Sequence, residues 1–276
     1  MKWKFYSLAF VAGMSILTAC SSDDNNDNDG NGNGNEIENG TILKGTITSD
    51  VTLAAGNTYK LSGEYIVEEG ATLHIEEGVK IIAVYDDIAD YILVKQGGKI
   101  NAVGTPDKPI VMTSEKEEPG AWGGIHICGR AHTNAEGGKG SSEIGGAVYG
   151  GNDDADNSGT LQYIRLEYTG FAFDEEHEAI GISFYGVGNG TIVDHCQAYK
   201  GSDDGFEFFG GSVNVSNLVA VSCSDDSFDW TEGWNGKGTN LVAYQEAEST
   251  LGYDCDCLME CDNNGSNNAA TPVAHP

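Results

Sequence analysis

The residues best suited to chemistry are two acidic turns at equivalent positions of a repeat. The segment 193–233 repeats itself at an offset of 22 residues, which places Ser202-Asp203-Asp204 on Ser224-Asp225-Asp226 and Glu207 on Asp229. The residues between the turns alternate in the manner of strands, and a repeat of this length is typical of a β-solenoid. The sequence therefore predicts that the carboxylates of one coil lie above those of the next.

Stacked carboxylates need a cation, a proton or open solvent. Neighbouring strands lie about 4.8 Å apart, and two unit charges at that separation repel by about 3.5 kcal/mol at an effective dielectric constant of 20. Calcium is the cation that we expect in an exported protein, because it takes carboxylate, carbonyl and water oxygens. The predicted calcium ligands of this acidic ladder are Asp203, Asp204, Glu207, Asp225, Asp226 and Asp229.

Two other interpretations of the ladder stay open. Asp and Ser turn the chain without any ligand, so a solvated stack of turns also explains the pattern. Paired Asp residues at β-helix turns resemble those of polygalacturonase-type hydrolases, and the catalytic candidates would then be Asp203, Asp204 and Asp225. The histidine and basic motifs of those enzymes are not evident here, and the only nearby cations are Lys200 and Lys237.

A second candidate calcium site lies some 50 residues earlier. Asp154, Asp156 and Ser158 supply oxygen donors at positions one, three and five, and a glycine follows, as at the opening of a calcium loop. The twelfth position is Arg165 rather than Glu, which excludes an EF-hand. An ordinary Asx-rich turn is the alternative.

The elements that position these residues are short strands punctuated by glycine, with about 22 residues per coil over residues 41–276. Successive strand side chains point to opposite faces. The pattern predicts two inward columns, formed by Ile164, Cys196, Leu218 and Leu241 and by Leu166, Ala198, Ala220 and Ala243. Along another face we expect Phe206 and Phe208 to stack on Phe228 and Trp230.

Two stretches interrupt the strand pattern. Residues 130–159 are rich in Gly, Ser and Asn and predict a long loop that projects from the solenoid. A second, shorter excursion, Asp174-Glu175-Glu176-His177-Glu178, lies within residues 171–190. Loops that interrupt a solenoid tend to cluster on one face, which is often the binding face.

The N-terminus predicts export and a lipid anchor. Residues 1–19 combine two lysines with an apolar run too short to span a membrane, as in a signal peptide. Leu17-Thr18-Ala19-Cys20 resembles the lipobox of bacterial lipoproteins, so that Cys20 would carry the lipid. Residues 20–40 are acidic and rich in Asn and Gly, which predicts a flexible tether.

Composition limits the partners. Without Lys2 and Lys4 the mature chain has 12 basic against 43 acidic residues, a net charge of −31. This charge excludes nucleic acid as a natural ligand, because binding it needs clustered Lys and Arg. Export permits disulfides, and we expect disulfides or buried thiols rather than a metal site at Cys128, Cys196, Cys223, Cys255, Cys257 and Cys261.

Several motifs together resemble one known family. They are GATLHIEEGVKI, GGKINAVGTPDKPIVMTS, WGGIHICGRAHTN, YGGNDDADNSGTLQYIRLEYTG, GSDDGFEFFGG and ECDNNGSNNAATP. The chain is similar to lipid-anchored outer-membrane proteins of Gram-negative bacteria that have a right-handed parallel β-helix of the pectate-lyase type. The resemblance implies an all-β fold and a place at the cell surface. Relatives continue with further coils, so we expect the β-helix to be C-terminally incomplete at Pro276.

The expected function is that of a surface-anchored lipoprotein whose non-enzymatic β-helix binds or presents an extracellular ligand, a glycan that calcium helps to bind. One alternative is a polysaccharide lyase or glycoside hydrolase of the β-helix type. Another is a purely structural or adhesive surface protein. The fold itself does not decide among them, because one fold hosts many functions.

The predicted anchor leads to a simple test. The substitution Cys20→Ala should move the protein from the membrane fraction to the soluble fraction, because no thiol remains to carry the acyl chains. Each methylene of such a chain that is buried in the membrane contributes about 0.8 kcal/mol to binding. Fractionation followed by immunoblotting measures the change. Unchanged membrane association of the variant would refute the lipoprotein interpretation.

Overall fold

The chain divides into two units, residues 1–32 and residues 33–276. The computed structural model describes residues 35–86, 88–173 and 178–275, all of which belong to the second unit. The predicted signal peptide, Cys20 and most of the tether lie outside the described residues. No helix among the described residues is long and apolar enough to cross a membrane.

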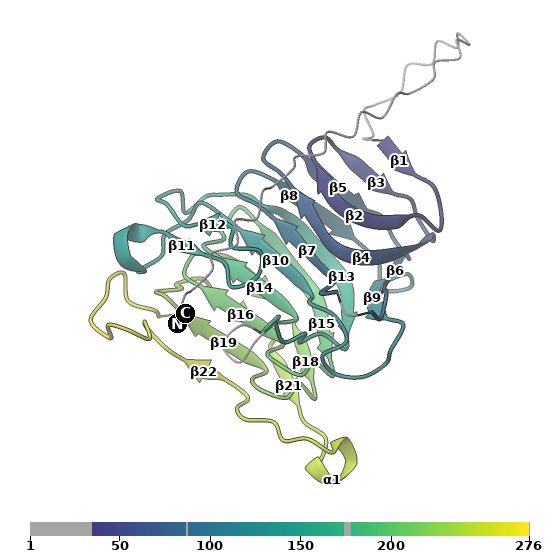
Figure 1. The fold of residues 1–276 in the computed structure, drawn as a ribbon. Helices are drawn as coiled ribbons and strands as arrows, with labels where there is room; N and C mark the ends of the chain where they lie inside the picture. Colours follow the sequence, from purple (N-terminus) through teal and green to yellow (C-terminus); the bar gives the residue numbers. More distant parts are fainter. Residues whose placement is uncertain (1–34, 87, 174–177, 276) are drawn as a thin grey trace, which may run out of the picture. The chain divides into compact units, whose positions relative to one another are not determined.

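The second unit is a right-handed parallel β-helix, as predicted (Figure 1). Twenty strands pair in parallel and form three faces, and the long strands β2, β4, β13 and β15 bend and contribute to two faces each. The first face holds β1 (Asn35–Ile37), β3 (Val51–Leu53), β5 (Thr72–Ile75), β8 (Lys99–Val103), β13 (Gly159–Glu167), β15 (Ile192–Tyr199), β17 (Asn214–Ser216) and β20 (Gly238–Thr239).

The second face consists of the later halves of β13 and β15 and the first halves of β2 (Ile42–Ile47) and β4 (Thr58–Val67). It also holds β6 (Lys80–Ala83), β9 (Ile110–Ser114), β18 (Val219–Val221) and β21 (Val242–Tyr244). The third face consists of the later halves of β2 and β4 together with six whole strands. These are β7 (Tyr91–Val94), β10 (Ile125–Cys128), β14 (Ile182–Tyr185), β16 (Phe206–Phe209), β19 (Phe228–Thr231) and β22 (Glu260–Cys261).

The predicted coil length is confirmed by the strand register. Phe206 pairs with Phe228, which lies 22 residues later in the chain, and Val51 pairs with Leu73 at the same offset. Other coils are longer where a loop intervenes. The 130–159 loop lies outside the parallel sheet and holds a short 3-10 turn (Glu136–Gly138) and an antiparallel hairpin, β11 (Gly140–Ser141) and β12 (Val148–Tyr149).

The corners of the coils recur at fixed positions. Tyr163, His195, Asn217 and Asn240 all have positive φ where the chain turns from the first face to the second. Asn tolerates this left-handed conformation better than most residues. The Asn240 amide donates to Asn217 Oδ1 at 3.0 Å, and the Tyr163 and His195 rings stack with centroids 4.5 Å apart. Stacked corner residues therefore hold successive coils in register.

The two inward columns are confirmed. Ile164 pairs with Cys196, and Ala198 pairs with Leu166 on one side and with Ala220 on the other. The columns are buried down to Leu218 and Ala220, whereas Leu241 and Ala243 in the last coil are only partly buried. The interior of the solenoid is therefore a continuous apolar core.

The aromatic stack differs from the prediction at one ring. Phe206 stacks on Phe228 with centroids 5.5 Å apart, as expected. Phe208 pairs with Trp230 in the backbone register, but its ring stacks on Trp234 at 4.3 Å. Trp234 reaches this position because the turn after β19 folds back over the core, and Trp230 remains half-buried.

Two further differences concern the ends of the β-helix. Residues 35–37 were predicted as tether but form β1, which pairs with β3, so the solenoid begins earlier than residue 41. A single helical turn, α1 (Glu248–Leu251), lies in the last coil, where no helix was expected.

The aromatic stack predicts a large loss of stability on truncation. Phe228→Ala should lower the free energy of unfolding by about 3 to 5 kcal/mol, because a fully buried ring leaves a cavity beneath Phe206. Val242→Ala is the matched control, since Val242 is half exposed and should change stability by about 0.5 kcal/mol or less. Urea denaturation measures both. A loss below about 1 kcal/mol for Phe228→Ala would contradict the packing of this ring against Phe206.

Candidate functional site

The acidic turns connect the second face to the third in two successive coils. Each turn ends in an aspartate whose carboxylate accepts a hydrogen bond from the coil above. Asp204 Oδ1 accepts from the backbone N–H of Asp226 at 2.8 Å, and Asp226 Oδ1 accepts from the backbone N–H of Cys257 at 2.8 Å. Gly205 permits this approach, since a Cβ there would lie 2.8 Å from the carbonyl oxygen of Ser227. The acidic ladder therefore has a structural role of its own.

The turns and the strands after them open into a pocket of about 250 Å³. Among the residues that the structure describes, ten line this pocket; nine of them are carboxylic acids, and none is Lys, Arg or His. This acidic pocket is lined by Glu143, Glu178, Ile180, Asp203, Asp204, Glu207, Asp225, Asp226, Asp229 and Glu260. All six predicted ladder ligands therefore come together in one place.

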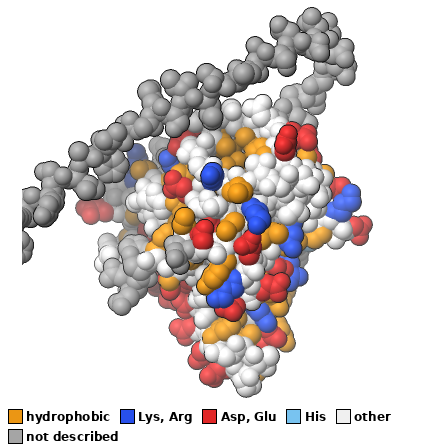
Figure 2. Space-filling view, turned by 45° about the vertical axis from the view of Figure 1, so that its right-hand side comes forward, with side chains coloured by type: hydrophobic (Ala, Val, Ile, Leu, Met, Phe, Trp, Pro, Cys, Tyr) orange, Lys and Arg blue, Asp and Glu red, His pale blue; other side chains and the backbone are white. Residues whose placement is uncertain are grey.

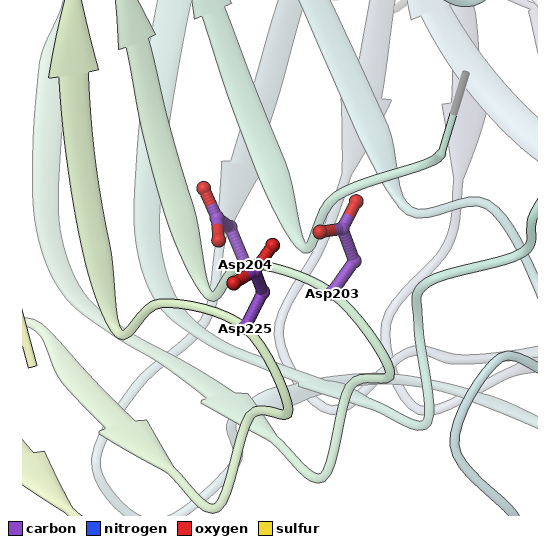
Figure 3. A group of neighbouring side chains, drawn as sticks. All are labelled: Asp203, Asp204 and Asp225. Atoms are coloured by element: carbon purple, nitrogen blue, oxygen red, sulfur yellow. The ribbon is translucent and has the colours of Figure 1, made fainter. Parts of the chain in front are cut away.

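Within the pocket the carboxylates form two close sets. Asp203, Asp204 and Asp225 bring one oxygen each to within 4.8 Å of one another, and Figure 3 shows their side chains converging from two successive turns. Asp204 also belongs to a second set with Glu207 and Asp229. Asp203 and Asp204 are only 8% and 7% exposed. Both sets have the spacing of oxygen ligands around a cation of the size of calcium.

A protein-family model described as the pectate-lyase-like β-helix domain matches residues 45–276. The chain belongs to this family. Neither a search of curated proteins nor a search of solved structures returned a significant match. The family assignment agrees with the three-faced parallel sheet and leaves the chemistry of this β-helix domain to be argued from its own residues.

Burial raises the affinity of the pocket for protons. Burial, together with the charge of Glu178, raises the pKa of Asp203 to about 7. Burial and a hydrogen bond with Glu260 raise the pKa of Asp226 to about 7, and burial raises the pKa of Asp229 to about 6. These carboxyl groups therefore titrate near neutral pH.

The two residues at the centre of the pocket are shifted further. Burial and the charge of Asp203 raise the pKa of Asp204 well above its ordinary range. Burial and the charges of Asp204 and Asp229 do the same for the pKa of Glu207. Both carboxyl groups need a proton or a cation beside them, because an isolated buried charge is costly.

Three acids of the β-helix domain reach the pocket from segments that the repeat did not indicate. Glu143 comes from the 130–159 loop, and Glu260 lies on β22 opposite Asp229. Glu178 ends the predicted excursion, whose residues 174–177 lie outside the described residues, and forms a bridge with Ala172. The tendency of loops to gather on one face of a solenoid indicated the two loops that carry Glu143 and Glu178, but it did not assign either residue to the acidic ladder.

The lysines that a lyase would use as its base lie elsewhere. Lys200 Nζ contacts Glu246 Oε2 at 3.1 Å, and Lys237 lines a separate groove with Asn214 and Thr239. On the face drawn in Figure 2, basic side chains mix with acidic ones. Outside the acidic pocket the described residues form ion pairs such as Lys60–Glu115 at 2.7 Å. The ten described residues that line the acidic pocket include no Lys, Arg or His.

The predicted calcium loop has different contacts. Asp154 Oδ1 lies 2.7 Å from His132 Nδ1 and also accepts from the His132 backbone N–H at 3.1 Å. Asp156 is buried, and its Oδ2 accepts from Ser158 Oγ at 3.1 Å. Asp154 and Asp156 thus have separate hydrogen-bond partners, and calcium binding by this loop stays a prediction.

The six cysteines of the described chain are all free thiols. Cys128, Cys196 and Cys223 are buried, and burial raises the pKa of each to about 12. Cys255 is half-buried, and Cys257 and Cys261 are exposed. Cys196 is a core residue, as expected, and the close metal-ligand sets among the described residues contain no cysteine.

The raised pKa values predict how stability depends on pH in the absence of metal. The folded state binds protons more tightly than the unfolded state between about pH 4, the ordinary Asp value, and about pH 7. The free energy of unfolding should therefore fall as the pH rises through this window. Thermal denaturation in a chelator should give a higher Tm at pH 5 than at pH 8.

Other acidic groups also contribute to this trend, so a variant provides the comparison. Asp203→Asn combined with Asp226→Asn should reduce the difference in Tm between pH 5 and pH 8, because neither amide titrates. An undiminished difference in the double variant would show that the pocket is not its source.

Proposed function

We propose that the chain is a non-enzymatic β-helix domain of a lipid-anchored surface protein, and that its acidic pocket binds calcium through which an extracellular glycan is held. The observation that carries the proposal is that nine carboxylic acids and no basic side chain line one pocket, as far as the structure describes its residues. Calcium supplies the missing positive charge and accepts six to eight oxygen ligands.

The place of the pocket also supports a cation. Asp203 and Asp204 come from one coil and Asp225 from the next, so a cation among them would link two coils. Without it, carboxylates at this spacing repel each other. Calcium would thus turn a repulsive contact between coils into an attractive one.

The glycan part of the proposal follows from the same charge. A chain with 43 acidic and 14 basic residues repels acidic glycans unless a cation bridges them. Calcium at the mouth of the pocket would keep some coordination positions for oxygen atoms that do not belong to the protein, since water commonly occupies part of its ligand shell. Sugar hydroxyl or carboxylate groups would take these positions.

The arrangement of lysines favours binding over catalysis. Lys200 is paired with Glu246, and Lys237 lines another groove, so neither stands in the acidic pocket as a base. Export and the lipid anchor rest on the signal peptide and Cys20. Acyl chains on Cys20 would hold the β-helix domain at the outer membrane.

A calcium titration tests the central claim. Millimolar calcium should raise the Tm of the purified mature chain at pH 7.5, because a ligand that binds only the folded state stabilises it by RT ln(1 + [L]/Kd). Extracellular calcium modules bind with Kd values of about 10⁻⁴ to 10⁻³ M, so a hundredfold excess over Kd would add about 2.7 kcal/mol. Asp203→Asn with Asp225→Asn should reduce the rise, because two of the carboxylates that hold the cation are lost.

The matched control is Asp154→Asn with Asp156→Asn, which should keep the response of the wild type. Loss of the response in this control alone would assign the metal to the 130–159 loop. A wild type whose Tm does not change with calcium would refute the proposal as a whole.

A glycan panel separates binding from catalysis. The wild-type chain should retain glycans in calcium and release them in a chelator, without forming unsaturated or reducing ends. Product formation that Asp204→Asn abolishes would instead identify a lyase or hydrolase.

A further inference from the structure

Resting on the proposed calcium function, we infer that the acidic pocket holds two divalent cations, with Asp204 as the carboxylate that bridges them. The two close sets of carboxylates share only this residue. Asp203 and Asp225 complete one set, and Glu207 and Asp229 complete the other.

The distances fit one ion for each set. Calcium lies 2.3–2.6 Å from its oxygen ligands, so two ligands of one ion are at most about 5 Å apart. The ligand atoms of each set lie within 4.8 Å of one another, whereas the five residues do not form a single set within that limit. The geometry therefore indicates two adjacent cation positions rather than one.

A buried atom without a partner supports the second position. Asp229 Oδ1 is inaccessible to solvent and has no hydrogen-bond partner, although the carboxyl group of Asp229 is hydrogen-bonded with Glu207. A buried carboxylate oxygen in this state is costly unless a proton or cation lies beside it. Glu207 and Asp204 are the acids beside Asp229 in the second set, so a cation there would satisfy the orphaned atom.

The first position has a similar deficit. Asp203 is more than nine-tenths buried and lines the pocket, and among its described contacts is a hydrogen bond with the backbone of the adjacent Asp204. A carboxylate offers about four lone-pair sites. Most of the acceptor capacity of Asp203 is therefore left for a cation.

Asp204 is suited to bridging. Its Oδ1 accepts one hydrogen bond, from the Asp226 N–H, which leaves lone pairs on both oxygens for two cations. The same hydrogen bond fixes the carboxylate between the two sets. One divalent ion would neutralise two of the five charges in the two sets, and two ions would neutralise four.

The number of bound ions tests this inference. Native mass spectrometry and calorimetry of the mature chain with Ca²⁺ should both give two ions per chain. Asp203→Asn with Asp225→Asn should leave one ion, and Glu207→Gln with Asp229→Asn should also leave one. Asp204→Asn should weaken both positions at least tenfold, while Asp154→Asn with Asp156→Asn should retain two ions.

Each other outcome has a defined meaning. One ion in the wild type would overturn the two-ion inference and keep the calcium function, whereas no ion would overturn both. Loss of one ion in the Asp154 and Asp156 variant would place the second ion in the 130–159 loop and overturn the shared site. The wild-type count depends on no substitution, so it remains decisive if a variant fails to fold.

Discussion

The structure depends on one constraint, the parallel register that places each residue of a coil above its equivalent in the coil before. Because paired strands lie about 4.8 Å apart, equivalent side chains of successive coils recur at that spacing along the axis. Apolar side chains benefit from this repetition, as in the Ala198–Ala220 column and the Phe206–Phe228 stack. Acidic side chains are penalised by it, because like charges are brought together. The interior and the acidic pocket are opposite results of the same geometry.

The acidic ladder also shows why the penalty is tolerated. Asp204 and Asp226 each accept a backbone N–H from the coil above, which holds the turn in place. An asparagine would also accept this bond, and therefore the hydrogen bond alone does not account for the choice of a charged residue. Glu143, Glu178 and Glu260 gather around the turns and add further acidic groups there, and Glu260 forms a hydrogen bond with Asp226. A ligand requirement explains this excess better than the needs of the fold.

The sequence predicted the features that arise from local repetition. The 22-residue offset was sufficient to place Phe206 on Phe228 and Glu207 on Asp229, because register in a solenoid is read directly from the repeat. It failed where the chain leaves the repeat. The ring of Trp234, which lies in the turn after β19, stacks on Phe208. The three residues of β1 have the composition of a tether, but they form a strand because they pair with β3. Glu143 reaches the pocket from 60 residues before Asp203, and Glu260 pairs with Asp229 at an offset of 31 residues that differs from the 22-residue repeat, so the repeat predicts neither contact.

Protons and cations compete for the same oxygens in this pocket. Asp203 and Asp226 have pKa values raised to about 7, so near neutral pH a cation that binds there displaces protons as it enters. Cation affinity must then increase with pH, because fewer protons have to leave at higher pH. The same raised pKa values make the metal-free fold less stable at higher pH. Rising pH thus weakens the empty β-helix and strengthens cation binding, so the stabilisation that a cation provides is largest on the alkaline side of neutrality.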